Sequence, residues 1–150
     1  MVTLHELACR LALDGIPPNT LGEIAEALIL DGFESPSLTA FLACDSPYSQ
    51  DRTTLFRRAL SELGEDLPGK HDAALSVSTI IARKIVAGTI TPFEGAYSIW
   101  KDALDQLEEI PPALWPFKSI ASAIEDCHHD TRQFGSDHSI KGIAAFFHDF

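Results

Sequence analysis

Glycines at the expected ends of helices divide this chain into short segments, and their spacing is the feature that most constrains its fold. Four glycines follow apolar residues at helical spacing, where a left-handed C-terminal cap belongs: Gly15, Gly32, Gly64 and Gly88. Within the segments leucine and alanine dominate, with 17 Leu and 18 Ala against only three Val. That mixture favours helices over sheets. We therefore predict an all-α, single-domain bundle of about eight short helices.

The predicted helices also begin at recognisable signals. Four residues are candidate N-caps: Thr3, Thr20, Ser35 and Thr91. Thr3, Thr20 and Thr91 each precede a glutamate by three residues, which is the spacing of a capping box. A proline follows Ser35 and Thr91 directly, and proline is favoured at the first helical position. After the first two helices, further helices are expected at about 36–43, 49–63, 71–87, 92–109, 116–130 and 139–150.

The pattern also predicts how the chain is organised. On a helical wheel, seven residues of the sixth predicted helix share one face: Phe93, Ala96, Tyr97, Trp100, Ala103, Leu104 and Leu107. We expect residues 1–150 to form one helical domain, with a candidate subdivision near 65–70, where Pro68 and Gly69 interrupt the helical pattern.

The cysteines and the apolar runs bear on the compartment. Cys9, Cys44 and Cys127 are an odd number, lie far apart and form no Cys-x-x-Cys pair, which suits free thiols in a reducing cytoplasm. The first ten residues lack the basic and apolar regions of a signal peptide. No apolar run is long enough to span a bilayer. We expect a cytoplasmic protein without a membrane partner.

Motifs of common enzymes are missing. The chain contains neither a phosphate-binding glycine loop nor a Gly-x-Ser-x-Gly nucleophile elbow. His5-Glu6-Leu7-Ala8-Cys9 misses the metalloprotease motif because cysteine replaces the second histidine. Glu125 lies near His129 at i+4 and near His128 at i+3. The second of these is a Glu-x-x-His pair, but a di-iron site needs a second Glu-x-x-His pair, which the chain lacks. We expect no catalytic residue, no metal and no cofactor, and hence no enzyme.

Charge gives the strongest indication of function. The chain carries 22 Asp and Glu against 11 Lys and Arg, a formal net charge of −11. Nucleic-acid binding needs clustered basic residues that displace counterions, and anionic membranes also attract basic segments. Arg52, Arg57 and Arg58 form the one basic spot, and Arg58 can pair with Glu62 at i+4, so it does not indicate an RNA site. The favoured partner is therefore a basic protein, unless the charge serves only solubility.

The negative charge is concentrated in two stretches. The 41 residues from Leu11 to Asp51 contain seven acidic residues and no Lys or Arg. Leu30 lies beside acidic residues on the face opposite the apolar stripe of the second helix, so it either packs under a neighbouring helix or anchors a protein partner. The candidate partner-binding residues here are Glu23, Glu26, Leu30, Asp31 and Glu34. The second stretch contributes Asp102, Asp105, Glu108 and Glu109.

A local pattern completes the sequence-based picture. It runs from Ala82-Arg83-Lys84-Ile85-Val86-Ala87-Gly88 through Glu94-Gly95-Ala96 and Ile99-Trp100 to Glu125-Asp126. This pattern resembles one found in small bacterial helical proteins. In being small, acidic and without enzyme motifs, the whole chain also resembles immunity proteins of contact-dependent growth inhibition systems. That resemblance implies a protein that binds and blocks a toxin domain, often a nuclease with a basic cleft.

The sequence thus predicts a non-enzymatic immunity protein whose acidic helical surface mimics phosphates and occupies the basic cleft of a toxin. Two alternatives remain open. The first is a small-molecule-binding or hydrolytic domain that uses Trp100, Trp115, Glu125 and His129. The second is an acidic adaptor subunit of an unrelated complex.

Overall fold

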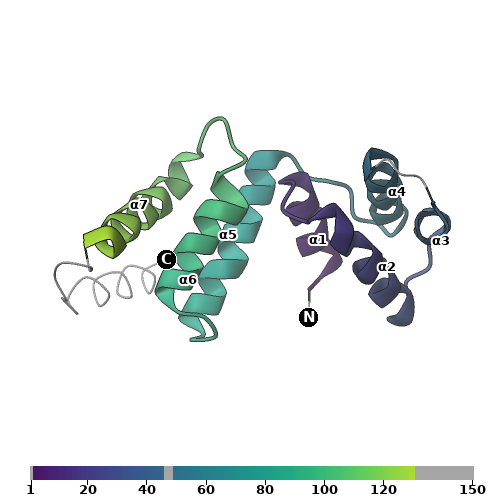
Figure 1. The fold of residues 1–150 in the computed structure, drawn as a ribbon, viewed down its shortest axis with the longest axis horizontal. Coiled ribbons are helices and arrows are strands. Elements are labelled where there is room, and N and C mark those ends of the chain that lie inside the picture. Colours follow the sequence, from purple (N-terminus) through teal and green to yellow (C-terminus); the bar gives the residue numbers. More distant parts are fainter. Residues whose placement is uncertain (1, 46–48, 131–150) are drawn as a thin grey trace. The chain divides into compact units, whose positions relative to one another are not determined.

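The fold is all-α. The computed structural model describes residues 2–45 and 49–130, and no strand occurs in those ranges (Figure 1). The expected helix at 139–150 lies outside the described residues. The chain divides into two compact units, Met1–Gly69 and Lys70–Phe150, and this boundary falls within the segment 65–70 that interrupts the helical pattern. Within the described ranges, no helix combines the length and the hydropathy needed to cross a bilayer.

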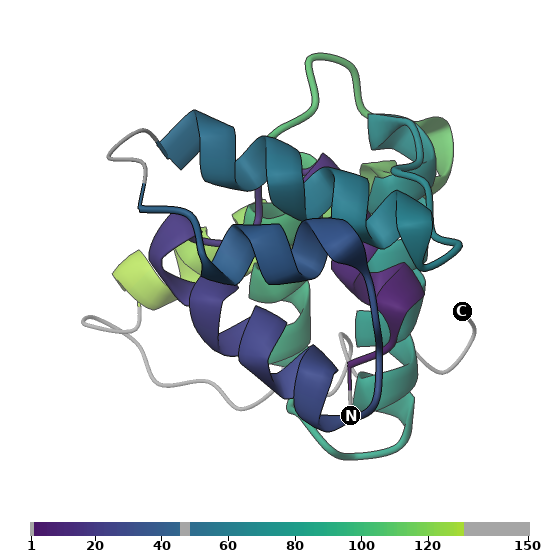
Figure 2. The same ribbon diagram turned by 90° about the vertical axis from the view of Figure 1, so that its right-hand side faces the viewer.

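The first unit is built around a small aromatic core. Its elements are α1 (Leu4–Ala12), the 3-10 turn η1 (Pro18–Thr20), α2 (Leu21–Leu30), α3 (Pro36–Leu42) and α4 (Ser49–Glu62). Figure 2 shows α3 lying between α2 and α4, and α3 contacts both of them. Phe41 of α3 and Phe56 of α4 are completely buried and meet edge to face, with ring centroids 5.5 Å apart. Apolar residues of α1 and α2, including Leu7 and Leu21, complete this core.

In the second unit, α5, α6 and α7 lie side by side (Figure 1). The elements are α5 (Lys70–Val86), α6 (Pro92–Ser98), the π-helix η2 (Ile99–Leu104), the 3-10 turn η3 (Pro112–Leu114) and α7 (Trp115–Asp130). The segment with three isoleucines in α5 is helical as expected, and Ile81 and Ile85 are buried there. Phe117 of α7 is also completely buried.

The sixth helix departs from the expectation, because it is not a continuous α-helix. The Asp105 N–H donates to the Trp100 carbonyl at 2.9 Å, an i to i+5 bond that widens the helix. The predicted apolar face is also wrong in part: Phe93 and Tyr97, which precede the π-helix, remain 37% and 50% exposed. The buried face consists instead of Gly95, Ala96, Ile99, Ala103 and Leu104.

The predicted helix starts are confirmed where the cap is purely local. Ser35 accepts from the Leu38 N–H at 3.2 Å, and Thr91 forms a complete capping box with Glu94. Hydrogen bonds from Thr91 hold the pKa of the Glu94 carboxyl below its ordinary value.

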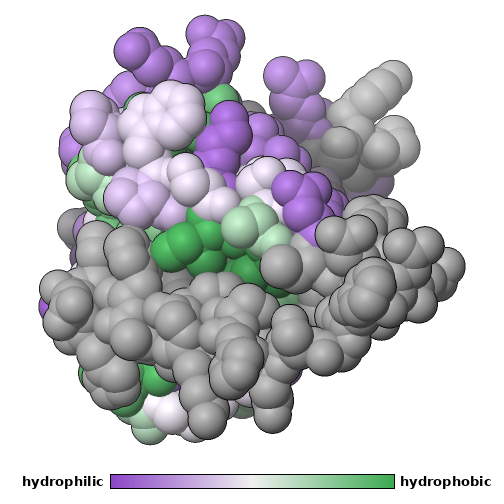
Figure 3. All heavy atoms as spheres, turned by 90° about the vertical axis from the view of Figure 1, so that its left-hand side faces the viewer, coloured by the Kyte–Doolittle hydropathy of each residue, from purple (hydrophilic) through white to green (hydrophobic). Residues whose placement is uncertain are grey.

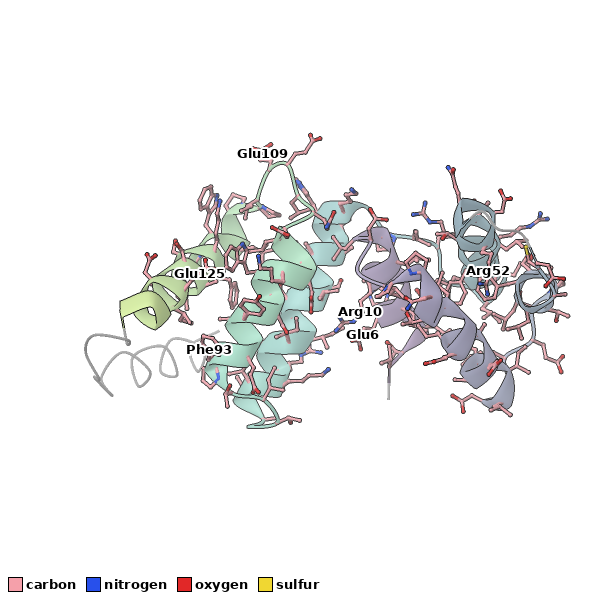
Figure 4. All side chains as sticks on the ribbon, viewed as in Figure 1. Glu6, Arg10, Arg52, Phe93, Glu109 and Glu125 are labelled. Carbon is pink, nitrogen blue, oxygen red and sulfur yellow. The ribbon has the colours of Figure 1, made fainter. Side chains whose placement is uncertain are left out.

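The two other predicted capping boxes are incomplete or wrong. Thr3 accepts from the Glu6 N–H, but the Glu6 carboxylate accepts from Arg10 Nε at 2.9 Å instead of closing the box (Figure 4). Thr20 caps nothing with its side chain, because it ends the turn η1 in a helical conformation and donates to the Pro17 carbonyl.

The helix ends follow the glycine signals with one exception. Gly32, Gly64 and Gly88 have φ of 91°, 92° and 72°, as predicted for left-handed caps. At the end of α1 the left-handed residue is Asp14, with φ 53°, and not Gly15. The helix ends one residue earlier than expected, and the Gly15 N–H donates to the Arg10 carbonyl at 2.8 Å.

Gly95 permits the contact between α6 and α5, and this yields a test of the second unit. A Cβ at position 95 would collide with the Ile85 side chain, which is buried and branched at its own Cβ. Gly95→Ala should destabilise the protein by up to about 2 kcal/mol, because overpacking costs roughly 1–3 kcal/mol and the gain in helix propensity returns about 1 kcal/mol of it. Urea unfolding followed by circular dichroism measures the change.

Two further variants make this test specific. Ile85→Val removes the Cδ1 methyl that an added Cβ would meet, so Gly95→Ala should cost less in that background. Gly69→Ala is the matched control, because a Cβ added there would meet nothing within 4 Å and the φ of Gly69 is not positive. Equal losses from Gly95→Ala with and without Ile85→Val would show that the contact with Ile85 is not the cause.

Candidate functional site: an acidic surface around Leu30

The first group of predicted partner-binding residues occupies the outside of α2 and the loop that leads to α3. All five are exposed: Glu23, Glu26, Leu30, Asp31 and Glu34. The group, called here the Leu30 surface, takes its helical members from the side of α2 that does not face the core. Ala25 and Leu28 are buried on the inner side of the same helix.

Leu30 is the most exposed large apolar side chain of the described residues, at 86% of its full area. The interpretation in which it packs under a neighbouring helix is therefore wrong. Ile29, directly before it, is also 41% exposed. Two adjacent exposed aliphatic side chains between Glu26 and Asp31 make an apolar spot with an acidic border.

A hollow of about 580 Å³ borders this spot. Ile29 and Phe33 supply apolar lining, and Glu34, Ser35 and Thr39 supply polar groups. A volume of this size admits side chains of a partner. The sequence did not indicate the hollow, because its lining comes from the end of α2, the following loop and α3 together.

Glu62 of α4 fixes the loop that carries Glu34. Its carboxylate accepts from Ser35 Oγ at 2.5 Å, from Ser37 Oγ at 2.6 Å and from the Ser37 N–H at 3.0 Å. Because these three bonds favour the charged form, first of all the bond from Ser35, they lower the pKa of Glu62 to about 2 from an ordinary 4.5. The acidic loop is therefore tied to α4 across more than twenty residues of sequence.

The basic spot on α4 is locally engaged, as the sequence indicated. Arg58 Nε lies 3.5 Å from Glu62, and Arg57 lies 3.8 Å from Asp14. Arg52 places its guanidinium 4.7 Å from the centroid of the Phe41 ring, in a cation–π contact (Figure 4). Arg52 also lies close to α2, because a Cβ added at Gly22 would come within 3.8 Å of its Nη2.

The second predicted group lies in the other unit, in η2 and the loop that follows. Asp105, Glu108 and Glu109 are exposed, whereas Asp102 is half-buried and engaged in other interactions. Figure 4 shows Glu109 at the tip of this loop, directed away from the helices of its unit. Sequence reasoning thus located the acidic loop, but Asp102 contributes less to its surface than the other three residues.

The aromatic region of the second unit differs from the predicted ligand site. Trp115 is 52% exposed, and Lys118 Nζ lies 5.3 Å from its ring centroid. Lys101 Nζ lies 4.0 Å from the ring centroid of Trp100. Neither tryptophan lines the apolar cavity of this unit. That cavity, of about 210 Å³, is lined by Phe93, Tyr97, Ala121, Ile124 and Glu125. It is smaller than the roughly 300–1,000 Å³ of typical ligand pockets.

Three titratable side chains lie close together around His5 of α1. His5 Nδ1 lies 3.3 Å from Glu65 Oε2, and His5 Nε2 lies 3.6 Å from Cys9 Sγ, an order that resembles a nucleophile, base and acid. Cys9 is completely buried, so its thiol does not meet a substrate in this conformation. Among residues 2–45 and 49–130, no three His, Cys, Asp or Glu side chains are placed to hold a metal ion. The side chain of His129 lies outside the described residues.

Comparison with family models, with curated proteins and with solved structures found no match for this chain. Its function is therefore inferred from its own surfaces.

The Glu62 contacts predict a pH dependence of the loop behind the Leu30 surface. A carboxyl with a folded pKa of about 2 and an ordinary value of 4.5 contributes stability that is fully present above pH 4.5. This contribution is lost as the pH falls from 4.5 towards 2. The protection of the α3 amides against hydrogen exchange, measured relative to the intrinsic exchange rate at each pH, should therefore fall over this window, and Glu62→Gln should lower it already at neutral pH.

Glu23→Gln is the matched control for this measurement. It removes the same charge from the same unit but touches neither Ser35 nor Ser37. If Glu62→Gln and Glu23→Gln changed α3 exchange equally, the effect would come from net charge and not from the serine contacts.

Proposed function

We propose that this chain is a non-enzymatic immunity protein that binds a cognate toxin domain through the Leu30 surface and so neutralises it. The observation that carries the proposal is the 86% exposure of Leu30 within an acidic border. A large aliphatic side chain left in water costs free energy, and a partner that covers it recovers roughly 1.5–3 kcal/mol. Such a residue is a natural centre for a protein interface.

The acidic border favours a basic partner. Glu26, Asp31 and Glu34 lie in a segment without lysine or arginine, so their field is not cancelled within that segment. Such a field steers a basic protein towards the surface and raises the association rate, an effect that salt weakens. A nuclease domain fits this chemistry because its substrate-binding cleft is basic, and carboxylates can take the place of phosphates there.

The proposal includes a cytoplasmic location. Cys9 and Cys44 are free thiols, and unpaired cysteines persist in a reducing compartment. A toxin that enters a bacterial cell would have to be captured there before it acts. Fast, electrostatically steered association suits that task.

The proposal predicts separable roles for the apolar and the acidic residues. Leu30→Ala should weaken toxin binding about tenfold or more, chiefly by faster dissociation, because it removes the central anchor. The triple change Glu23→Lys, Glu26→Lys and Asp31→Lys should weaken binding strongly by slowing association, and added salt should then slow association less than it does for the unaltered chain. Surface plasmon resonance at several salt concentrations separates the two effects.

Matched controls exclude general damage to the fold. Val86→Ala truncates another aliphatic side chain, 52% exposed, in the other unit, and should leave affinity unchanged. Circular dichroism should be the same for all variants, since the altered side chains are exposed. Unchanged toxin affinity in both the Leu30 and the triple variant would contradict the site assignment.

A separate experiment addresses the second acidic group. Asp105→Lys, Glu108→Lys and Glu109→Lys together should weaken binding further if the toxin reaches the η2 loop, and should have no effect if the Leu30 surface suffices. The toxin itself is found by co-expressing this chain with the toxin domain encoded beside its gene. A stable one-to-one complex and restored growth support the immunity function, and growth arrest despite expression of both proteins would falsify it.

A further inference from the structure

The apolar cavity between α6 and α7 lies outside the surface assigned to the toxin. Phe93 and Tyr97 stack on one side of it, with ring centroids 6.5 Å apart, and Ala121 and Ile124 of α7 form the other side. Figure 3 shows apolar side chains exposed among hydrophilic ones on one face of this unit. A cavity of about 210 Å³ suits one large apolar side chain better than a metabolite.

The sequence after α7 contains a segment of matching chemistry. Ile140, Ile143, Ala144 and Phe147 follow each other at i, i+3, i+4 and i+7, the spacing of one apolar helix face. This is the helix that the sequence predicts at 139–150. Lys141 stands beside that face, and Glu125 stands at the cavity, so the charges are also complementary.

The chain is long enough to bring the two together. Ile124 and Ala121 precede the end of α7 at Asp130 by six and nine residues, or about 9 and 14 Å along the helix. The eight residues 131–138 can span up to about 26 Å and include Gly135, which favours a reversal. A helix at 139–150 can therefore run back along α7 and reach the cavity.

We propose that the cavity between α6 and α7 is the docking site of the chain's own segment 139–150, and that Phe147 enters it. The segment binds as an amphipathic helix with the face of Ile140, Ile143 and Phe147 against α6 and α7. Phe93 and Tyr97, exposed on the first side of the cavity, receive it. The cavity then contributes to the packing of the second unit and is not a substrate pocket.

The test uses the full-length chain with a charge placed on either face of the segment. Phe147→Asp puts a carboxylate on the docking face, whereas Ala145→Asp puts the same group on the opposite face. Amide hydrogen exchange of residues 93–97 and 121–125 should become about 10- to 100-fold faster in Phe147→Asp, the range expected when one buried phenylalanine is lost. Ala145→Asp should leave these rates unchanged.

A thermodynamic cycle keeps the test decisive if Phe147→Asp disturbs the whole unit. Phe147→Ala and Ile124→Ala should be non-additive, so that the second change raises the equilibrium constant for unfolding by a smaller factor once the first is made. Trp115 lies on α7 like Ile124 but does not line the cavity, so the effects of Phe147→Ala and Trp115→Ala on stability should be additive.

Three outcomes overturn the proposal. Equal exchange rates in Phe147→Asp and the unaltered chain would leave the cavity without this occupant. Additivity of Phe147→Ala with Ile124→Ala would exclude their contact. Loss of the protection on about a hundredfold dilution would assign the cavity to a second copy of the chain.

Discussion

The contact of Glu62 with Ser35 and Ser37 is the interaction on which the proposed toxin-binding surface depends. It ties the end of α4 to the start of α3, and Glu34 stands immediately before this junction. A carboxylate that accepts three hydrogen bonds remains ionised and holds its donors in one geometry. The loop between α2 and α3 is thereby anchored at its far end, while Gly32 terminates α2 at its near end. Acidic groups held in this way lose little conformational entropy when a partner binds.

Much of the fold could be predicted from the sequence because its signals are local. The cap at Ser35, the capping box of Thr91 and the left-handed Gly32, Gly64 and Gly88 each depend on a few neighbouring residues. Thr20 has the same local pattern but fails, because the prolines before it form a turn that places it in a helical conformation. The π-helix could not be predicted from a wheel drawn at constant spacing, since one inserted residue changes which side chains face α5.

The sequence predicted which acidic residues are exposed at the candidate site, but not the exposure of Leu30 or the hollow beside it. Net charge and the gap in lysine and arginine located the acidic segment, and exposure of its carboxylates follows from the cost of burying charge. The sequence could not decide whether Leu30 is covered, because that depends on which helices pack beside α2. The hollow beside Ile29 and the clamp by Glu62 also join residues far apart in the chain. Such contacts have no signature in a single sequence.

Acidic groups and an exposed apolar side chain contribute differently to the selectivity of a surface for one partner among many basic proteins. Carboxylates alone attract any cationic surface, including ribosomal and nucleic-acid-binding proteins, and their attraction fades with salt. Leu30 adds a contact that strengthens binding only if the partner offers an apolar recess opposite it, with cations placed for Glu26 and Asp31. A basic protein without such a recess must either cover the leucine poorly or leave water between the charges. Selectivity on this surface would therefore come from the position of one leucine within the charges, while the charges themselves set how fast the partner arrives.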